Sequence, residues 1–261
     1  MVSLLLIILL VLLISRKRKR NAEQWAELEE QRRLARIAEL QRLAELEEQR
    51  TQTLNAVTNA NRGTDSEHEL ILSLLEYGIQ AKAIFHDLYF RKPNGGYSQV
   101  DVVVATNVGI IVFEVKDYSG WIYGNGMDDM WTQVLAYGQE KHRFYNPIKQ
   151  NFGHINTIKN TLKQFENIPF YSVIVFYGSN ELENVYNIPH YVKLIDSSEL
   201  TEVLDHILQT NPPAPYTDKW EVVSLFKQAV ANGANEAIVN SHNERIHRRY
   251  AHRNISKYKY W

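Results

Sequence analysis

The chain has 261 residues, is 44% hydrophobic, carries a formal net charge of -1 and contains no cysteine. The lack of cysteine excludes a disulfide scaffold, a cysteine-ligated zinc site and a thiol nucleophile. The hydrophobic content excludes wholesale disorder, and the length allows one domain of ordinary size with appendages.

The chain begins with an apolar segment in which every position from 4 to 14 is Leu, Ile or Val. This run predicts a membrane anchor at residues 1–15, with contact to the bilayer through Val2–Ile14. Five cations follow at positions 16–20. By the positive-inside rule they predict a single-pass protein with its amino terminus outside and its main domain in the cytoplasm. A cleaved signal peptide is the alternative.

Residues 16–57 are predicted to form a basic juxtamembrane segment and a helical stalk. From position 21 to 57 there is no Pro or Gly, and good helix formers dominate. The large apolar residues step by three, so the stripe winds around the helix instead of holding a coiled-coil seam. We expect a charged spacer helix and leave self-association through a coiled coil open. The stripe residues are Leu34, Ile37, Leu40, Leu43 and Leu46.

Residues 58–210 are predicted to form the main domain, of class α/β (α+β), with a mixed central sheet flanked by helices. Apolar spacing predicts a helix that begins near Thr64, and Asn146-Pro147 predicts the start of a second helix. Residues 97–105 and 110–115 are rich in β-branched residues and flank a turn, which indicates a hairpin. Two further strands are expected at 170–177 and 191–195, followed by a helix capped by Ser197 or Ser198.

Residues 211–261 are predicted to hold a Pro-rich break, a short helix and a basic tail with interleaved aromatic residues. Such a tail suits phosphate binding with base stacking, or contact with the anionic inner leaflet. A solvated tail without a partner is the third alternative.

The hairpin brings four chemically active side chains to one face. If it folds symmetrically about its turn, Asp101 lies opposite Glu114, and Gln99 lies opposite Lys116. Two opposed carboxylates in an apolar sheet repel each other and are costly to desolvate, so a cation must compensate them. Lys116 neutralises one charge, whereas a bound Mg²⁺ (or Mn²⁺) neutralises both. A buried cluster that only balances its own charge is the structural alternative.

Four segments of the chain share the pattern of a known family: SEHELILSLL, HDLYF, SQVDVVVATNVGIIVFEVKDYSGWIYG and NPIKQNFGHI. They resemble the nuclease-related domain called NERD, of the PD-(D/E)xK nuclease superfamily. The resemblance implies a restriction-endonuclease-like fold, with catalytic residues and metal ligands at Glu67, Asp101 and Glu114. It also implies a catalytic role for Lys116 and a motif role for Gln150.

Two of these residues have structural alternatives. Glu67 lies three residues after Thr64, as in a capping box, where it only bonds back to the helix start. Gln150 lies in the first turn of its helix and could serve a hydrogen bond there, or bind substrate together with Gln99. The leading hypothesis is a membrane-tethered, metal-dependent nuclease that acts on DNA or RNA, with DNA favoured as the partner. The alternative is a non-cleaving nucleic-acid-binding or scaffold protein that keeps the nuclease fold.

Overall fold

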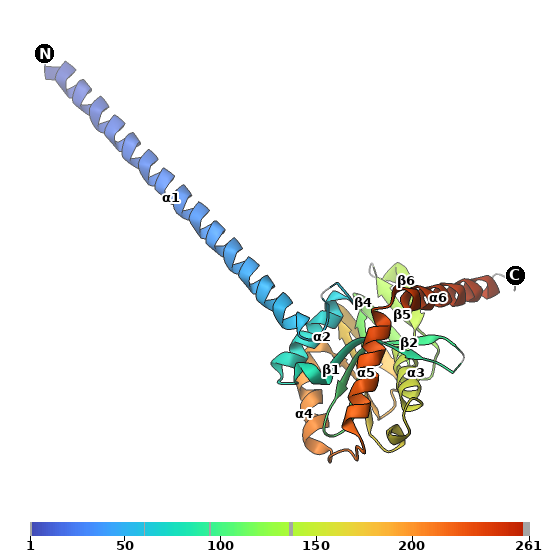
Figure 1. Cartoon of the computed structure of the whole chain (residues 1–261). Helices are drawn as coiled ribbons and strands as arrows, with labels where there is room; N and C mark the ends of the chain where they lie inside the picture. The colour runs from blue at the N-terminus through green and yellow to red at the C-terminus, as the bar shows by residue number, and fades with distance from the viewer. Residues whose placement is uncertain (1, 60, 94, 136–137, 258–261) are drawn as a thin grey trace. The chain divides into compact units, whose positions relative to one another are not determined.

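The computed structural model describes residues 2–59, 61–93, 95–135 and 138–257 (Figure 1). Met1 and the last four residues of the predicted basic tail, 258–261, lie outside the described residues. The chain divides into two units, residues 1–52 and 53–261. The first is a single helix, and the second is a mixed α/β domain.

Helix α1 (Val2–Asn55) makes up the first unit and continues into the start of the second. The helix expected over the stalk is therefore present, as an uninterrupted stretch without Gly or Pro favours. The large apolar residues of its stripe are exposed; Leu34 is 54% exposed and Leu40 is 59% exposed.

The predicted membrane anchor at residues 1–15 is not supported. Among the described residues, no helix is long and apolar enough to cross a membrane. The reason lies in the local sequence, because the apolar run from Leu4 to Ile14 is followed after Ser15 by five cations. A span requires about 20 predominantly apolar residues.

The second unit is built on a five-stranded mixed sheet with the strand order β1-β2-β3-β7-β9. Strands β1 (Ile84–Arg91), β2 (Tyr97–Ala105) and β3 (Ile110–Asp117) are antiparallel neighbours. Strand β7 (Phe170–Tyr177) runs parallel to β3, and β9 (Val192–Asp196) runs parallel to β7. The predicted mixed sheet is confirmed, and β1 is an addition that the sequence pattern did not indicate.

Helices cover both faces of this sheet (Figure 1). On one face, α2 (Asp65–Glu76) and α4 (Leu200–Thr210) pack their apolar stripes on inward residues of β2 and β3. On the other face, α3 (Pro147–Lys159) and α5 (Lys219–Gly233) do the same. Helix α5 follows the Pro-rich break, and its fully buried Phe226 makes this segment part of the same core.

A second sheet of four strands has the order β6-β5-β4-β8. Its strands are β4 (Gly120–Asn125), β5 (Met130–Leu135), β6 (Glu140–Tyr145) and β8 (Asn180–Tyr186). None of them was predicted, because most of their residues are partly or fully exposed and give only a weak apolar pattern. The fully buried Trp131 of β5 joins the two sheets, since its ring stacks with Phe176 of β7.

Short 3-10 helices and a last long helix complete the unit. They are η1 (Ala81–Ala83), η3 (Lys163–Glu166), η4 (Ser197–Glu199) and α6 (Glu236–Lys257). The predicted cap at Ser197 or Ser198 is wrong by one or two residues. Helix α4 has Glu199 at its N-cap position, and the side-chain cap belongs to the preceding η4. There the Asp196 carboxylate accepts from the Ser198 amide at 2.9 Å, while Glu199 bonds back to the Asp196 amide. An aspartate with a glutamate three residues on forms this reciprocal pair better than serine alone.

Candidate functional site

The central hairpin folds in the predicted register and then opens. The last backbone pair of β2 and β3 is Val102 with Phe113, whose numbers sum to 215 as expected. The next residues along the two strands are Asp101 and Glu114. There the backbone amide of Val115 donates to Oδ2 of Asp101 at 2.8 Å instead of to a backbone carbonyl. The two carboxylates therefore lie where the two central strands separate.

Glu114 is the most deeply buried charged group of the site, with no exposed surface. Its Oε1 accepts from Nζ of Lys116 at 2.5 Å. Its Oε2 lies 3.2 Å from Nε2 of His154, but neither atom has a partner in hydrogen-bond geometry. Burial alone raises the pKa of Glu114; the charge of Lys116 and the contact with His154 outweigh it, so that the pKa is lowered. The chain thus holds this buried carboxylate ionised.

Asp101 differs from Glu114 in its electrostatics. Burial raises the pKa of Asp101 well above its usual range, and the neighbouring charge of Glu114 raises it further. Lys116 and the hydrogen bond from Val115 lower it but do not compensate. Two adjacent carboxylates that share one ammonium group leave an excess of negative charge, and such a pair favours a second cation.

Lys116 links the hairpin to helix α3. Its Nζ donates to Gln150 Oε1 at 3.3 Å as well as to Glu114. Burial lowers the pKa of Lys116, but the charges of Glu114 and Asp101 outweigh it, so the pKa is raised. Gln150 reaches this position because Asn146 caps α3 and Pro147 occupies its first turn. Of the two roles considered for Gln150, a hydrogen bond at its own helix end and one at the site, its side chain makes the contact with Lys116 at the site.

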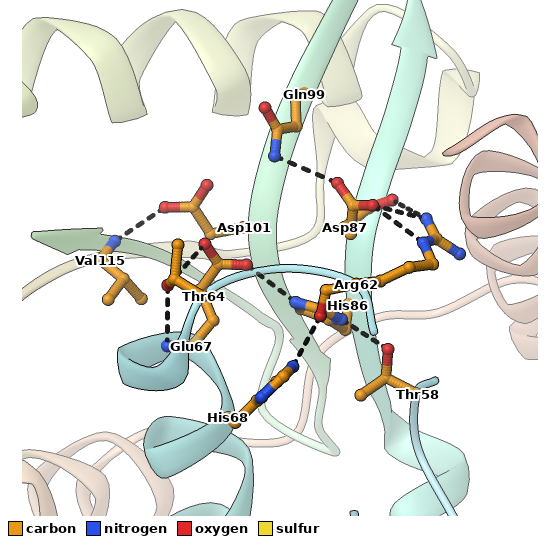
Figure 2. A network of polar contacts seen from close by, with 10 residues as sticks. All are labelled: Thr58, Arg62, Thr64, Glu67, His68, His86, Asp87, Gln99, Asp101 and Val115. Carbon is orange, nitrogen blue, oxygen red and sulfur yellow. Dashed lines mark hydrogen bonds and ion pairs between the residues drawn. The ribbon is translucent and has the colours of Figure 1, made fainter. Parts of the chain in front are cut away.

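Glu67 lies in a separate polar network, drawn in Figure 2. Its Oε2 contacts Nε2 of His86 at 2.8 Å, and its Oε1 accepts from the hydroxyl of Thr64 at 3.0 Å. The other ring nitrogen of His86 lies 2.6 Å from the hydroxyl of Thr58. Glu67 therefore bonds the Thr64 side chain, not its backbone amide, and points toward the sheet as the nuclease hypothesis requires. Its charge contributes to the raised pKa of Asp101, so the two carboxylates interact electrostatically.

Gln99 does not face Lys116, as the symmetric hairpin predicted. It pairs with Tyr89 on β1, and its Nε2 donates to Oδ1 of Asp87 at 3.1 Å. Asp87 adopts a left-handed backbone with φ of 53°, and two guanidinium nitrogens of Arg62 donate to its Oδ2 at 2.7 and 3.0 Å (Figure 2). The β2–β3 ladder that would place Gln99 opposite Lys116 has already ended, so β1 determines its contacts.

A pocket of about 350 Å³ opens beside this site. Strand β2, helix α3 and helix α6 all contribute to its walls. The combination of one carboxylate, an amide pair, two ammonium groups and two imidazoles suits a ligand that bears phosphate oxygens. The residues that carry this character are Lys92, Gln99, Asp101, Lys149, Gln150, His154 and His242.

The donor set for a metal ion is the pair Asp101 and Glu114. Among the described residues, no group of three or more His, Cys, Asp or Glu side chains is arranged to hold a metal. Mg²⁺ requires only one or two carboxylates, with waters and substrate oxygens completing its octahedron. The buried Oε2 of Glu114, which has no hydrogen-bond partner, is an available oxygen ligand, so the pair fits such an ion.

Sequence reasoning missed His154 as a neighbour of Glu114 and missed Asp87 altogether. His154 Nδ1 lies 2.9 Å from the hydroxyl of Ser98, which holds the ring against Glu114. The spacing of Gln150 and His154, one helical turn apart, was the signal that both face the same side. No local signal marks Asp87, because its role depends on Arg62, 25 residues earlier.

Comparison with known proteins agrees with this geometry. Residues 62–177 match the family model of the nuclease-related domain, NERD. An uncharacterized protein of Bacillus anthracis is 32% identical over 102 residues, which cover 39% of this chain and 46% of that relative. The chain thus spans less than half the length of that relative, and no solved structure matches. The segment that holds Glu67, Asp101, Glu114, Lys116 and Gln150 therefore lies within the match to the nuclease-related domain.

Proposed function

We propose that this chain hydrolyses phosphodiester bonds in nucleic acid, with DNA ahead of RNA, at the point where β2 and β3 separate. The observation that carries the proposal is the grouping of Asp101, Glu114 and Lys116 beside a pocket, inside a nuclease-related domain. A restriction-endonuclease-like arrangement of the sheet is part of the same proposal. It rests on the mixed sheet with helices on both faces.

The residues fit a divalent cation, Mg²⁺ or Mn²⁺. Asp101 and Glu114 would hold it, since they are adjacent and share one ammonium group, with Glu114 buried and Asp101 partly exposed to the pocket. A bound ion of this kind would lower the pKa of a water molecule and neutralise charge on the phosphate. Glu67 is the third proposed ligand on the family resemblance, although its oxygens bond to His86 and Thr64 in this structure.

The remaining side chains position charge. Lys116 presents an ammonium group whose place is set by Glu114 and Gln150. In a substrate complex this group would orient the attacking water and stabilise the negative charge that develops on the phosphate oxygens. His154 packs against Glu114 and keeps its carboxylate in place. Gln99 and Gln150 line the pocket, and their amide groups would bind substrate oxygens.

A second candidate function is a nucleic-acid-binding module that does not cut. One specific observation favours it, because both oxygens of Glu67 already have partners, which leaves Asp101 as the site carboxylate that lines the pocket. Such a module would bind nucleic acid through the pocket without needing a metal ion.

The test uses the full chain. Titration with Mg²⁺ and Mn²⁺ by calorimetry is followed by incubation with labelled DNA and RNA, single- and double-stranded. We expect Asp101→Ala to lose metal binding, and both Asp101→Ala and Lys116→Ala to lose cleavage by about 10²–10³-fold or more. Matched controls are Asp128→Ala and Lys82→Ala, which remove exposed groups of the same kind and should change neither.

Three outcomes separate the candidates. Metal binding and cleavage that both disappear in Asp101→Ala support the nuclease. Nucleic-acid binding that is unaffected by a chelator, with no cleavage of any substrate, supports the non-cutting module. Cleavage at the wild-type rate in both Asp101→Ala and Lys116→Ala overturns the assignment of the site.

A further inference from the structure

Helix α6 (Glu236–Lys257) has a strongly uneven charge. After Glu244 it contains five Lys and Arg residues and no acid. Arg245, Arg249, Arg253 and Lys257 recur at every fourth residue, the spacing at which helix positions share a face. From the first to the last of these positions the helix rises about 18 Å, which equals the rise of about five nucleotides in one strand of B-DNA.

The first part of α6 is attached to the domain at the pocket. Nδ1 of His242 lies 3.1 Å from the backbone carbonyl of Tyr97 at the start of β2, and its ring makes an edge contact with Tyr89. The Arg245 guanidinium lies so close to Gly96 that a Cβ there would overlap it. These contacts fix where the helix leaves the domain.

The same part of α6 also forms a wall of the pocket. His242 and Ile246 line it, opposite Lys149, Gln150 and other residues of helix α3. Beyond this wall, Arg245 and Arg248 are exposed, and the helix continues to Lys257 (Figure 1). Arg245 and Arg248 therefore lie on the helix segment that also lines the pocket containing Asp101.

We propose that α6 is a nucleic-acid-binding arm, along which the phosphates of a strand that enters the pocket bind Arg245, Arg248 and the cations that follow. This inference rests on the proposed function, since it names how the substrate of that same site is held. Arg245 and Arg248 are two exposed guanidinium groups close to a pocket with further cations, and guanidinium groups suit phosphate oxygens. Arg248 is paired with Glu244 at 2.9 Å, but an exposed ion pair of this kind contributes little, so a phosphate can replace the carboxylate.

An anionic membrane surface is the competing partner for a basic helix. The position of α6 favours nucleic acid, because its attached part lines the pocket instead of presenting an apolar face to solvent. Apolar residues are also sparse in its second half, whereas interfacial helices bury a continuous apolar face.

The experiment measures binding by the full chain, with a chelator present so that no cleavage occurs. Labelled single- and double-stranded DNA and RNA are titrated at several salt concentrations by fluorescence anisotropy. The test variant is Arg245→Ala/Arg248→Ala. The matched control is Lys82→Ala/Lys163→Ala, which removes two exposed cations that line other pockets. A second variant ends the chain after Ile246, which keeps the attached part of α6 and removes the cations beyond it.

Counterion release gives the expected size of the effect. Each phosphate contact adds about 0.9 to the slope of log K against log salt on duplex DNA, so the double variant should lose about 1.8. Relative to 1 M salt, this corresponds to about 60-fold weaker binding at 0.1 M salt. The control should bind within about twofold of wild type, and the shortened chain should lose more slope than the double variant.

The outcomes distinguish this inference from the proposed function. An unchanged salt slope in both α6 variants, with nucleic acid still bound, overturns the arm and leaves the nuclease proposal standing. Loss of slope in a chain that never cleaves supports the arm and overturns the nuclease. If wild type binds no nucleic acid, both proposals fail. Variants that lose binding to phosphatidylserine vesicles but not to nucleic acid overturn the arm in favour of a membrane surface.

Discussion

Asn146 joins helix α3 to the second sheet, and its replacement tests how the site is anchored. The side chain is fully buried, and its Oδ1 accepts from the Ile148 amide at 2.9 Å as the cap of α3. Its Nδ2 donates to the carbonyls of Asp128 at 2.6 Å and Gly126 at 3.1 Å, in the turn between β4 and β5. One amide group therefore supports the helix that carries Gln150.

Two substitutions separate these roles. Asn146→Ser keeps an oxygen that can cap the helix but removes the hydrogen bonds that Nδ2 donates to the turn, each worth about 1 kcal/mol. We expect the free energy of unfolding to fall by about 2–4 kcal/mol. Asn146→Ala also removes the cap and should lose about 1 kcal/mol more. For a unit of this size, each kcal/mol lowers Tm by about 2–4 °C.

The assay is urea unfolding of the full chain, followed by near-UV circular dichroism because it reports on packed aromatic residues such as Trp131. The control is Asn156→Ala on the same helix, which should change stability by no more than about 0.5 kcal/mol. If Asn146→Ser has the wild-type free energy of unfolding, the hydrogen bonds to the turn contribute nothing. If Asn146→Ser and Asn146→Ala have the same free energy of unfolding, the cap contributes nothing. Either result refutes the reasoning.

Two further predictions concern packing and pH. Trp131→Ala should lower the free energy of unfolding by about 3–5 kcal/mol, because the ring is fully buried between the sheets. The control is Trp220→Ala, at an 81% exposed position, whose free energy of unfolding should stay within about 0.5 kcal/mol of the wild-type value. Urea unfolding of the pair checks this. Hydrogen bonds from the backbone and side chain of Ser198 lower the pKa of Asp196 in the folded protein. The ionised carboxylate therefore adds to the free energy of unfolding at any pH above its pKa in the unfolded chain, and this contribution is lost as pH falls through its lower pKa in the folded protein. Asp196→Ala should therefore be about 1 kcal/mol less stable than wild type at pH 7, with the gap closing below about pH 4 in a series of melts; a constant gap contradicts the assignment.

Local sequence was sufficient wherever structure depends on neighbours along the chain. The turn between Ala105 and Ile110 set the hairpin register, because a symmetric two-strand ladder has only one spacing once its turn is known. The starts of α2 and α3 were correctly predicted near Thr64 and at Asn146-Pro147, where both residues prove to be caps, since a capping side chain bonds an amide two or three residues away. The membrane anchor predicted at this same level is not supported, since no helix in the described part of the chain is long and apolar enough to cross a membrane.

Contacts between distant segments could not be predicted in this way. The partner of Glu67 is His86, the partner of Gln99 is Asp87, and the neighbour of Glu114 is His154. Each pair joins two different helices or strands, so its distance depends on how those elements pack. The second sheet was missed for the same reason, because β4 pairs in parallel with β8 about sixty residues later.

By itself the sequence determined the ordered set of Asp101, Glu114 and Lys116 on one hairpin, because alternation along two paired strands places side chains on a common face. Only the tertiary structure decided what surrounds that set. Packing of α3 brought His154 and Gln150 to Glu114 and Lys116, and packing of α6 added His242 and Ile246 to the wall of the pocket. The physical reason is that strand pairing is local in this hairpin, whereas the helices are positioned by burial of apolar area, which carries no directional signal in the sequence.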